Sequence, residues 1–406
     1  MLYTRYEADQ ALMNTGTKKL MFGALIAIML SIPLGVLPGM KFLAEADWLR
    51  LLSMVAIFGI GALGLNVLTG MAGQVSLGHA FFMGVGAYTA AWLGAAPGPL
   101  LGIGLPMWIW LPAAGIVAAV IGVVVGPTAV RVRGLYLAFV TLGLVFVGEY
   151  LWRNWDTISG GSQAGRDFPG FAFRLWKEEA PLIDFSSPGP WFGIELSSQA
   201  KTYYFLAALL IVAVVLVKNL QRTRVGRAFQ SIRDRDIAAE IMGVNDFKYK
   251  LVAFGISSFY AGVAGALFAG FVGRMIPETW GLFLSVQMIA IILIGGAGVV
   301  TGTILGSVFV IVLPRIVEDF TGWLAGVARS GSGVSAGLAD IFVSTGSGDF
   351  GFVNIAAGTA PGLSTAQLNQ ILYGLLIIGF LIFEPLGLYG IWLRIRNYWK
   401  GWPFTY

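Results

Sequence analysis

The chain alternates between long apolar runs and short polar connections. Runs close to the ~20 residues that cross a bilayer as a helix fall at 20–38, 49–68, 76–95, 106–126, 135–152, 203–219, 250–272, 282–298, 300–318 and 369–385. We therefore expect an all-α polytopic membrane protein with about ten transmembrane helices. Glycines interrupt the third run and the 282–318 pair, so broken helices are expected there.

Composition supports this fold class. The chain is 57% hydrophobic and 12% charged, whereas a soluble domain carries about 25% charged residues. The 56 glycines suit membrane helices that pack closely. Cysteine is absent, which excludes disulfides, thiolate metal sites and cysteine nucleophiles. The polar segment Met1–Lys19 and the apolar run after it lack a small-residue cleavage site, so we predict a retained anchor helix.

The distribution of Lys and Arg predicts that both termini are cytoplasmic, because basic residues concentrate at the cytoplasmic ends of membrane helices. Those expected on that side are Arg5, Lys18, Lys19, Arg131, Arg133, Lys218, Arg222, Arg224, Arg227, Arg233, Arg235, Lys248, Lys250, Arg394, Arg396 and Lys400. The predicted organisation is a cytoplasmic segment 1–19, a permease-like membrane domain 20–390 and a cytoplasmic tail 391–406. Inside the domain we expect an external loop 153–202, a cytoplasmic loop 220–249 and an external Gly/Ser-rich insertion 321–368. The insertion is either a flexible segment or a docking surface.

A soluble-type helix interrupts the membrane pattern at residues 227–243, RAFQSIRDRDIAAEIMG. Its apolar positions recur at helical spacing, and Gly243 is placed to end it. The apolar set is Ile232, Ile237, Ala238, Ile241 and Met242, and the charged set is Arg233, Asp234, Arg235, Asp236 and Glu240. A short amphipathic helix of this kind fits a groove in a soluble partner, which suggests a transporter driven by another subunit.

A polar, glycine-rich stretch at residues 64–88 lies within the second and third apolar runs. Unsatisfied polar groups cost several kcal/mol in lipid, so Asn66, Gln74, Ser76 and His79 must face other helices or a water-filled path. These groups either form hydrogen bonds with one another as a structural cluster or contact a passing solute. Tyr88 is the last residue of the same stretch. Glu149 is expected to be solvated near a membrane interface.

Enzymatic chemistry finds little support in the motifs. The sequence has no G-x-x-x-x-G-K-[ST] loop for nucleotide hydrolysis and no G-x-S-x-G elbow. A single histidine, His79, excludes a two-His metal site.

Several segments in order resemble the permeases of branched-chain amino acid ABC importers, specifically the LivM-type subunit. They are GLNVLTGMAGQVSLGHAFFMGVGAY (64–88), VRGLYLAFVTLGLVFVGEY (132–150), NWDTISGGSQ (154–163), the stretch 222–267, GGAGVVTGTILGSVFVIVLP (295–314) and LYGLLIIGFLIFEPLGLYG (372–390). The resemblance implies an inner-membrane importer subunit of a prokaryote. It would pair with a related LivH-like permease, two cytoplasmic ATPases that hold ATP and Mg, and an external substrate-binding protein, and would bind no cofactor itself.

The resemblance also implies site residues. Residues 236–243 are similar to the family's ATPase-coupling loop, E-A-A-x-x-x-G: Ala238, Ala239 and Gly243 match, and Ile237 stands at the Glu position. We expect ATPase coupling by Arg227, Asp236, Ala238, Ala239, Glu240 and Gly243, and a substrate path along Asn66, Gln74, Ser76, His79 and Tyr88. The insertion 321–368 and the stretch 164–202 are longer than in this family.

Three other functions stay open from the sequence. A permease of the same kind could carry urea, short amides or aromatic acids. An ion-coupled secondary transporter would need charged groups at mid-membrane, which are sparse. A scaffold or receptor without transport would leave the glycine-broken polar stretch unexplained.

Overall fold

The computed structural model describes residues 16–36, 41–130, 135–176, 181–191, 193–330, 342–344, 353–354, 362–384 and 386–401. The longer helices are α2 (Gly16–Ser31), α3 (Ala46–Leu65), α4 (His79–Gly94), α5 (Met107–Val130), α6 (Leu135–Asn154), α9 (Ser198–Arg222), α10 (Arg224–Asp234), α12 (Asp246–Val272), α13 (Leu282–Gly295), α14 (Val300–Ser330), α16 (Thr365–Phe383) and α17 (Gly387–Gly401). The short ones are α7 (Asp156–Ser159), α8 (Gly161–Ala164), α11 (Asp236–Ile241), the 3-10 turns η1 (Lys41–Ala44) and η3 (Pro277–Trp280), and the π-helical η2 (Asn66–Met71).

The strands are short and lie in the connections. β1 (Arg166–Asp167) pairs antiparallel with β6 (Arg274–Met275), β2 (Ala172–Phe173) with β3 (Ile183–Asp184), and β4 (Gly189–Trp191) with β5 (Ile194–Leu196). A parallel set joins β7 (Val343–Ser344), β8 (Val353–Asn354) and β9 (Leu363–Ser364). The β1–β6 pair attaches the 153–202 segment to the end of α12.

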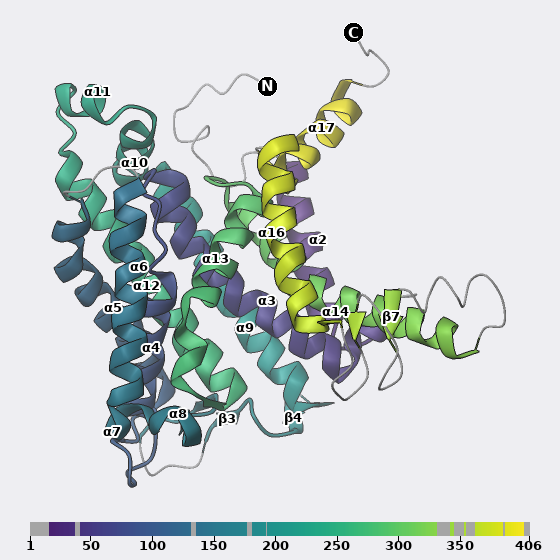
Figure 1. Ribbon diagram of the computed structural model, residues 1–406. Coiled ribbons are helices and arrows are strands. Elements are labelled where there is room, and N and C mark those ends of the chain that lie inside the picture. Colours follow the sequence, from purple (N-terminus) through teal and green to yellow (C-terminus); the bar gives the residue numbers. More distant parts are fainter. Residues whose placement is uncertain are drawn as a thin grey trace.

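The helices form one bundle with distinct ends (Figure 1). α4, α5 and α12 pack together, and α3 lies against α9, α12 and α14. α10, α11 and α17 lie at one end of the bundle, while α7, α8, β3 and β4 lie at the opposite end. The buried core centres on α3, α4 and α12, which are apolar around most of their circumference.

The structure confirms a polytopic helical membrane protein. Six described helices are long and apolar enough to cross a membrane, and shorter apolar helices accompany them. Each of the ten predicted runs coincides with a helix, but the bounds differ, most for the run 20–38, whose helix α2 ends at Ser31, and for the 282–318 pair. The run 282–298 is helical only to Gly295, and the run 300–318 continues as α14 to Ser330, so the segment expected as an external insertion begins as helix. Arg5, Arg131, Arg133 and most of 331–361 lie outside the described residues.

Close contact between α4 and α12 depends on glycine. A Cβ added at Gly86 would collide with the backbone of Gly262, and one added at Gly265 would collide with the backbone of Met83. Small residues at facing positions let membrane helices approach closely and gain dispersion contacts. The absence of side chains at these positions therefore sets the distance between α4 and α12. These two helices contribute much of the buried core.

We expect Gly86→Ala to destabilise the bundle by about 1–3 kcal/mol, because overpacking forces α4 and α12 apart. Thermal unfolding of purified protein in detergent measures the change. Gly143→Ala on α6 is the matched control, since its added Cβ meets nothing within 4 Å. Alanine has the higher helix propensity, so the control should be neutral or slightly stabilising. Equal melting temperatures for the two variants would contradict this account of the contact.

Candidate functional site: a helix break joined to the α10–α11 pair

The polar segment predicted around Asn66 is a break at the end of α3. The α-helix ends at Leu65, continues as the π-helical η2, and the chain then turns at Gly73 with φ of 69°. π-helical turns frequently mark functional sites. Thr69 Oγ1 donates to the Gln74 carbonyl at 3.0 Å, which closes the turn. Gly73 therefore permits a break here, but the third apolar run itself is not broken, because α4 is continuous from His79 to Gly94.

A second break lies between α13 and α14 and contacts the first. Gly296 and Gly298 adopt φ of 117° and 86°, conformations that favour glycine. The Gly298 N–H donates to Asn66 Oδ1 at 2.7 Å, and the Gly298 carbonyl accepts from Gln221 Nε2 at 3.5 Å. A Cβ at Gly70 would overlap Asn66 and Gly298. Three distant parts of the chain therefore meet at Gly298.

Arg233 of α10 ties this junction to the neighbouring helix pair. Its Nη1 donates to the Gly70 carbonyl at 2.6 Å. A side chain at Gly73 would strike Arg233, so the arginine lies directly on the turn. A hydrogen bond from a charged donor is stronger than a neutral one, and here it joins α10 to the π-helical end of α3.

The prediction of a single helix across 227–243 is wrong, because the structure has two. α10 ends at Asp234, and Arg235 is extended with φ of −158° and ψ of 100°. Buried Phe229 and Ile232 hold α10 against the bundle, and Phe229 lies edge-to-face with Tyr249 of α12. α11 then starts at Asp236, whose carboxylate accepts from the Ile237 N–H at 2.9 Å.

Gly243 ends α11 as predicted. It adopts φ of 88°, its N–H donates to the Glu240 carbonyl, and the Val244 N–H donates to the Ala239 carbonyl. This pair of bonds is a Schellman motif, which satisfies the last carbonyls of a helix. The C-terminal end of α11 is therefore closed by a defined motif, while its N-terminal end follows directly on the extended Arg235.

The apolar face of α11 points away from the bundle. Ile237, Ile241 and Met242 are 63%, 80% and 84% exposed. Among the residues predicted to contact a partner, Arg227, Ala238, Glu240 and Gly243 are exposed and Asp236 is half-buried. Ala239 is 5% exposed, so its side chain packs inward. The Arg227 guanidinium donates to the Arg222 carbonyl at 2.8 Å.

The predicted path residues are buried within this chain. Asn66, Gln74, Ser76, His79 and Tyr88 are all at most 5% exposed. Ser76 Oγ accepts from the Gly78 N–H at 3.2 Å. In the part of the chain that the structure describes, Asn66 Nδ2, both Gln74 amide atoms, His79 Nε2 and the Tyr88 hydroxyl have no hydrogen-bond partner. They do not satisfy one another as a closed cluster.

Tyr88 lies apart from the other four. It is nine positions beyond His79 on α4, about 14 Å along the helix, and packs against Trp152 at a centroid distance of 4.7 Å. Phe168 and Trp280 complete this aromatic group. Phe81 also stacks on Trp152, at a centroid distance of 6.4 Å, and Phe82 is a buried packing residue.

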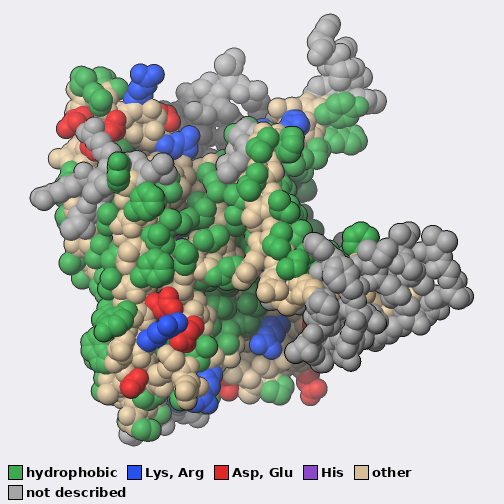
Figure 2. Space-filling view, viewed as in Figure 1, with side chains coloured by type: hydrophobic (Ala, Val, Ile, Leu, Met, Phe, Trp, Pro, Cys, Tyr) green, Lys and Arg blue, Asp and Glu red, His purple; other side chains and the backbone are tan. Residues whose placement is uncertain are grey.

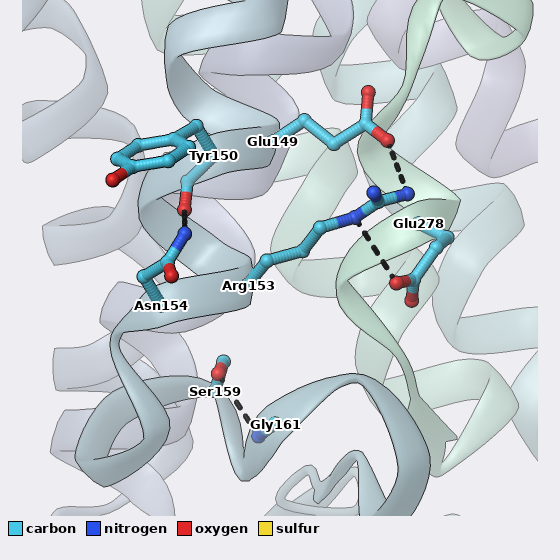
Figure 3. A network of polar contacts seen from close by, with 7 residues as sticks. All are labelled: Glu149, Tyr150, Arg153, Asn154, Ser159, Gly161 and Glu278. Atoms are coloured by element: carbon cyan, nitrogen blue, oxygen red, sulfur yellow. Dashed lines mark hydrogen bonds and ion pairs between the residues drawn. The ribbon is translucent and has the colours of Figure 1, made fainter.

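Two sets of charged contacts near the opposite end of the bundle were not predicted from the sequence. Glu149 is paired rather than simply solvated: Arg153 lies between Glu149 Oε1 at 2.7 Å and Glu278 Oε1 at 3.1 Å (Figure 3). Arg166 is 1% exposed and donates to the carbonyls of Ile158, Ala91 and Leu101, which fastens the 153–202 segment to α4. Burial lowers the pKa of Arg166. No group of three or more metal-ligating side chains occurs within the described residues.

The fold and the two joined breaks define a multi-pass helical membrane protein with a polar helix pair at one end. The chain belongs to the family described as the permease component of the branched-chain amino acid transport system, whose model matches residues 48–381. It is accordingly a permease subunit located in the plasma membrane.

Curated relatives agree with this family. The chain is 34% identical over 315 residues to the high-affinity branched-chain amino acid transport system permease protein LivM of Salmonella typhimurium, covering 76% of this chain and 70% of the relative. It is 32% identical, with the same coverage, to LivM of Escherichia coli K12. It is 27% identical over 250 residues to the autoinducer 2 import system permease protein LsrC of Salmonella paratyphi B, covering 57% of this chain and 64% of the relative. No solved structure matches.

Proposed function

We propose that the chain is a permease subunit of an ATP-driven ABC importer for branched-chain or related hydrophobic amino acids. It pairs with a second, LivH-like permease, two cytoplasmic ATPase subunits bind below, and an external binding protein delivers the solute. ATP and Mg are held by the ATPases, and this chain binds no cofactor. The related permeases named above, LivM and LsrC, belong to branched-chain amino acid transport and to import.

One observation carries the proposal: α11 exposes apolar side chains on a short helix that a Schellman motif closes. Exposed apolar patches on a folded element mark interaction sites, and an amphipathic helix inserts its apolar face into a partner's groove. Ile237, Ile241 and Met242 supply that face. Arg227, Asp236, Ala238, Glu240 and Gly243 surround it, and Ala239 supports it from inside.

The junction offers a mechanical route from α11 to the membrane segment. The ATPase pair would have two conformations. It can change the conformation of the permease only if α11 binds those two conformations with different free energies. Arg233 connects α10 to Gly70, and Asn66 connects η2 to Gly298 between α13 and α14. A movement of the helix pair would therefore displace both helix breaks together.

The buried polar residues fit a path that is closed in this conformation. Leaving a buried donor or acceptor unpaired costs about 1–3 kcal/mol, so such groups need an explanation. Asn66, Gln74 and His79 would gain water or solute as partners when the breaks move, with Ser76 beside them. Tyr88 would meet the solute nearer the opposite end. This is the functional alternative of the two that the sequence left open.

The proposal includes about ten spans and cytoplasmic termini. α10, α11 and α17 lie at the same end of the bundle (Figure 1). That end carries Lys218, Arg222, Arg224, Arg227, Arg233 and Arg235, which suits the cytoplasmic side by the positive-inside rule.

Purification in mild detergent with uptake assays tests the proposed function. We expect a Walker-A ATPase and a second permease to copurify, and leucine uptake to stop when ATP is depleted. Recovery of the chain alone, with uptake that an uncoupler abolishes and ATP depletion does not, would instead establish an ion-coupled transporter.

A further inference from the structure

A cavity of about 620 Å³ lies between α3, α12, η3, α13 and α14, at the end of the bundle opposite α10 and α11. This volume is in the range of small-molecule sites. Its lining contains basic and acidic side chains together with apolar ones. On the face shown in Figure 2, charged side chains of both signs lie in the lower part, on either side of a recessed apolar area.

The two kinds of lining side chain are separated by depth. α3 enters the bundle from this end, with Asp47 and Arg50 in its first turns and Phe58 further along. Asp47 and Phe58 are eleven residues apart, about 16 Å along the helix. On α14, Ile311 is likewise deeper than Glu318, by about 10 Å. The cavity therefore has a charged mouth and an apolar floor.

The floor is made of well-fixed side chains. Phe58 and Phe268 lie edge-to-face with ring centroids 5.2 Å apart. Phe58 and Phe268 are at most 8% exposed, so the floor is part of the packed core, and buried Leu284 in the first turn of α13 lines the wall. Such a surface suits a branched aliphatic group and would gain from its burial.

The cavity mouth contains a cation, Arg50, and an anion, Glu278, that can each bind a further group. Arg153 takes one oxygen of Glu278, at 3.1 Å, but Glu278 Oε2 is buried and has no hydrogen-bond partner among the described residues. Glu149 shares the same arginine, so the three charges sum to one negative (Figure 3). The Arg50 guanidinium lies 5.9 Å from the centroid of the Phe271 ring, and no described carboxylate forms an ion pair with it.

We propose that this cavity binds one amino acid zwitterion with an apolar side chain. Arg50 binds the carboxylate, the Glu278 carboxylate accepts a hydrogen bond from the ammonium, and Phe58, Phe268 and Leu284 contact the side chain. The assignment rests on the proposed function, in which this end faces the side from which solute arrives. It adds a site on the permease itself, at the entrance to the path.

The site can be tested by asking whether leucine protects a single introduced thiol from reaction with a thiol reagent. The chain has no cysteine, so Met54→Cys places one thiol of this chain on the cavity wall. The transporter complex, reconstituted in nanodiscs without binding protein, is treated with a thiol reagent at rising leucine concentrations. We expect leucine to slow labelling of Met54→Cys and to leave labelling of Leu182→Cys unchanged, since Leu182 is 62% exposed and lies outside the cavity.

Ligand analogues test the two charges without altering the protein further. Leucinamide lacks the carboxylate, and 4-methylpentanoate lacks the ammonium. Each should need about a ten- to hundredfold higher concentration for half-protection, as expected for losing a charge-assisted hydrogen bond. Protection by either analogue at the leucine concentration would overturn zwitterion recognition.

Variants then assign each charge to a residue. Arg50→Gln should weaken protection by leucine about ten- to hundredfold and remove the preference over leucinamide. Glu278→Gln should remove the preference over 4-methylpentanoate. Protection by leucine that is unchanged in both would overturn the assignment, and if either variant fails to assemble, the analogue comparison on Met54→Cys alone decides.

Leucine uptake by the complete transporter distinguishes failure of the proposed binding site from failure of the proposed transport function. If leucine is imported but never protects Met54→Cys, the cavity is not a binding site and the proposed function stands. If leucine is not imported, the proposed function fails and the site assignment fails with it.

Discussion

We expect uptake to fall by at least about a hundredfold when Ile241 and Met242 of α11 are both replaced by Glu, while the subunit stays folded. These side chains are 80% and 84% exposed, so they contribute almost nothing to the core of this chain. In the assembled transporter they would lie in an apolar groove, where unpaired carboxylates cost several kcal/mol to bury. Uptake of radiolabelled leucine into cells measures the effect.

Two controls separate loss of docking from loss of folding. Ile241→Leu with Met242→Leu keeps the apolar face and should transport normally. Gln230→Glu adds a carboxylate at an exposed position of α10 and should also be tolerated. The double Glu variant should reach the membrane at normal levels without retaining the ATPase on purification. Normal uptake by that variant would remove α11 as the docking element.

Arg233→Ala should uncouple ATP hydrolysis from transport. Its guanidinium donates to the Gly70 carbonyl at 2.6 Å, and no other described bond joins α10 to η2 so directly. A hydrogen bond from a charged group contributes about 1.5–3 kcal/mol, so the solute moved per ATP should fall about ten- to hundredfold. ATPase activity and uptake are measured together in proteoliposomes, and their ratio reports the coupling.

Arg235→Ala is the matched control for that variant. Arg235 is an exposed arginine two residues away, in the extended link between α10 and α11. Its removal should leave the ratio close to that of the wild type. Arg233→Lys keeps the charge with a shorter, non-planar donor and should give an intermediate ratio. A normal ratio in Arg233→Ala would show that the junction does not transmit movement.

Local patterns predicted the elements of this fold better than their junctions. Each apolar run gave a helix, because length and composition determine whether a segment can span lipid. Gly243 was recognised as a helix end because the signal is one residue in its own turn. The break at Arg235 was missed, since Phe229 packs against Tyr249 of α12, and that contact competes with continued helical periodicity.

The site was harder to predict because its contacts are long-range. Asn66 and Gly298 are joined by a hydrogen bond across 232 positions, and Arg233 reaches Gly70 across 163. The sequence identified Asn66 and both glycine-rich stretches as polar or broken, but it gave no indication that they meet. Glu278 was likewise not predicted, since its place in the site depends on an ion pair with Arg153 on another helix.

The shortness of α13 has a consequence for how the protein is made. Its 14 residues span about 21 Å, well short of the ~30 Å hydrocarbon layer. When α13 leaves the ribosome, its C-terminal carbonyls at Gly295 and Gly296 would meet lipid unsatisfied. Their surroundings come from later parts of the chain: Gly302 and Gly306 of α14, and the Leu386–Gly387 turn. We therefore expect α13 to be held stably in the membrane only once these later segments have been made, so a truncation after α13 should be a substrate for quality-control proteases.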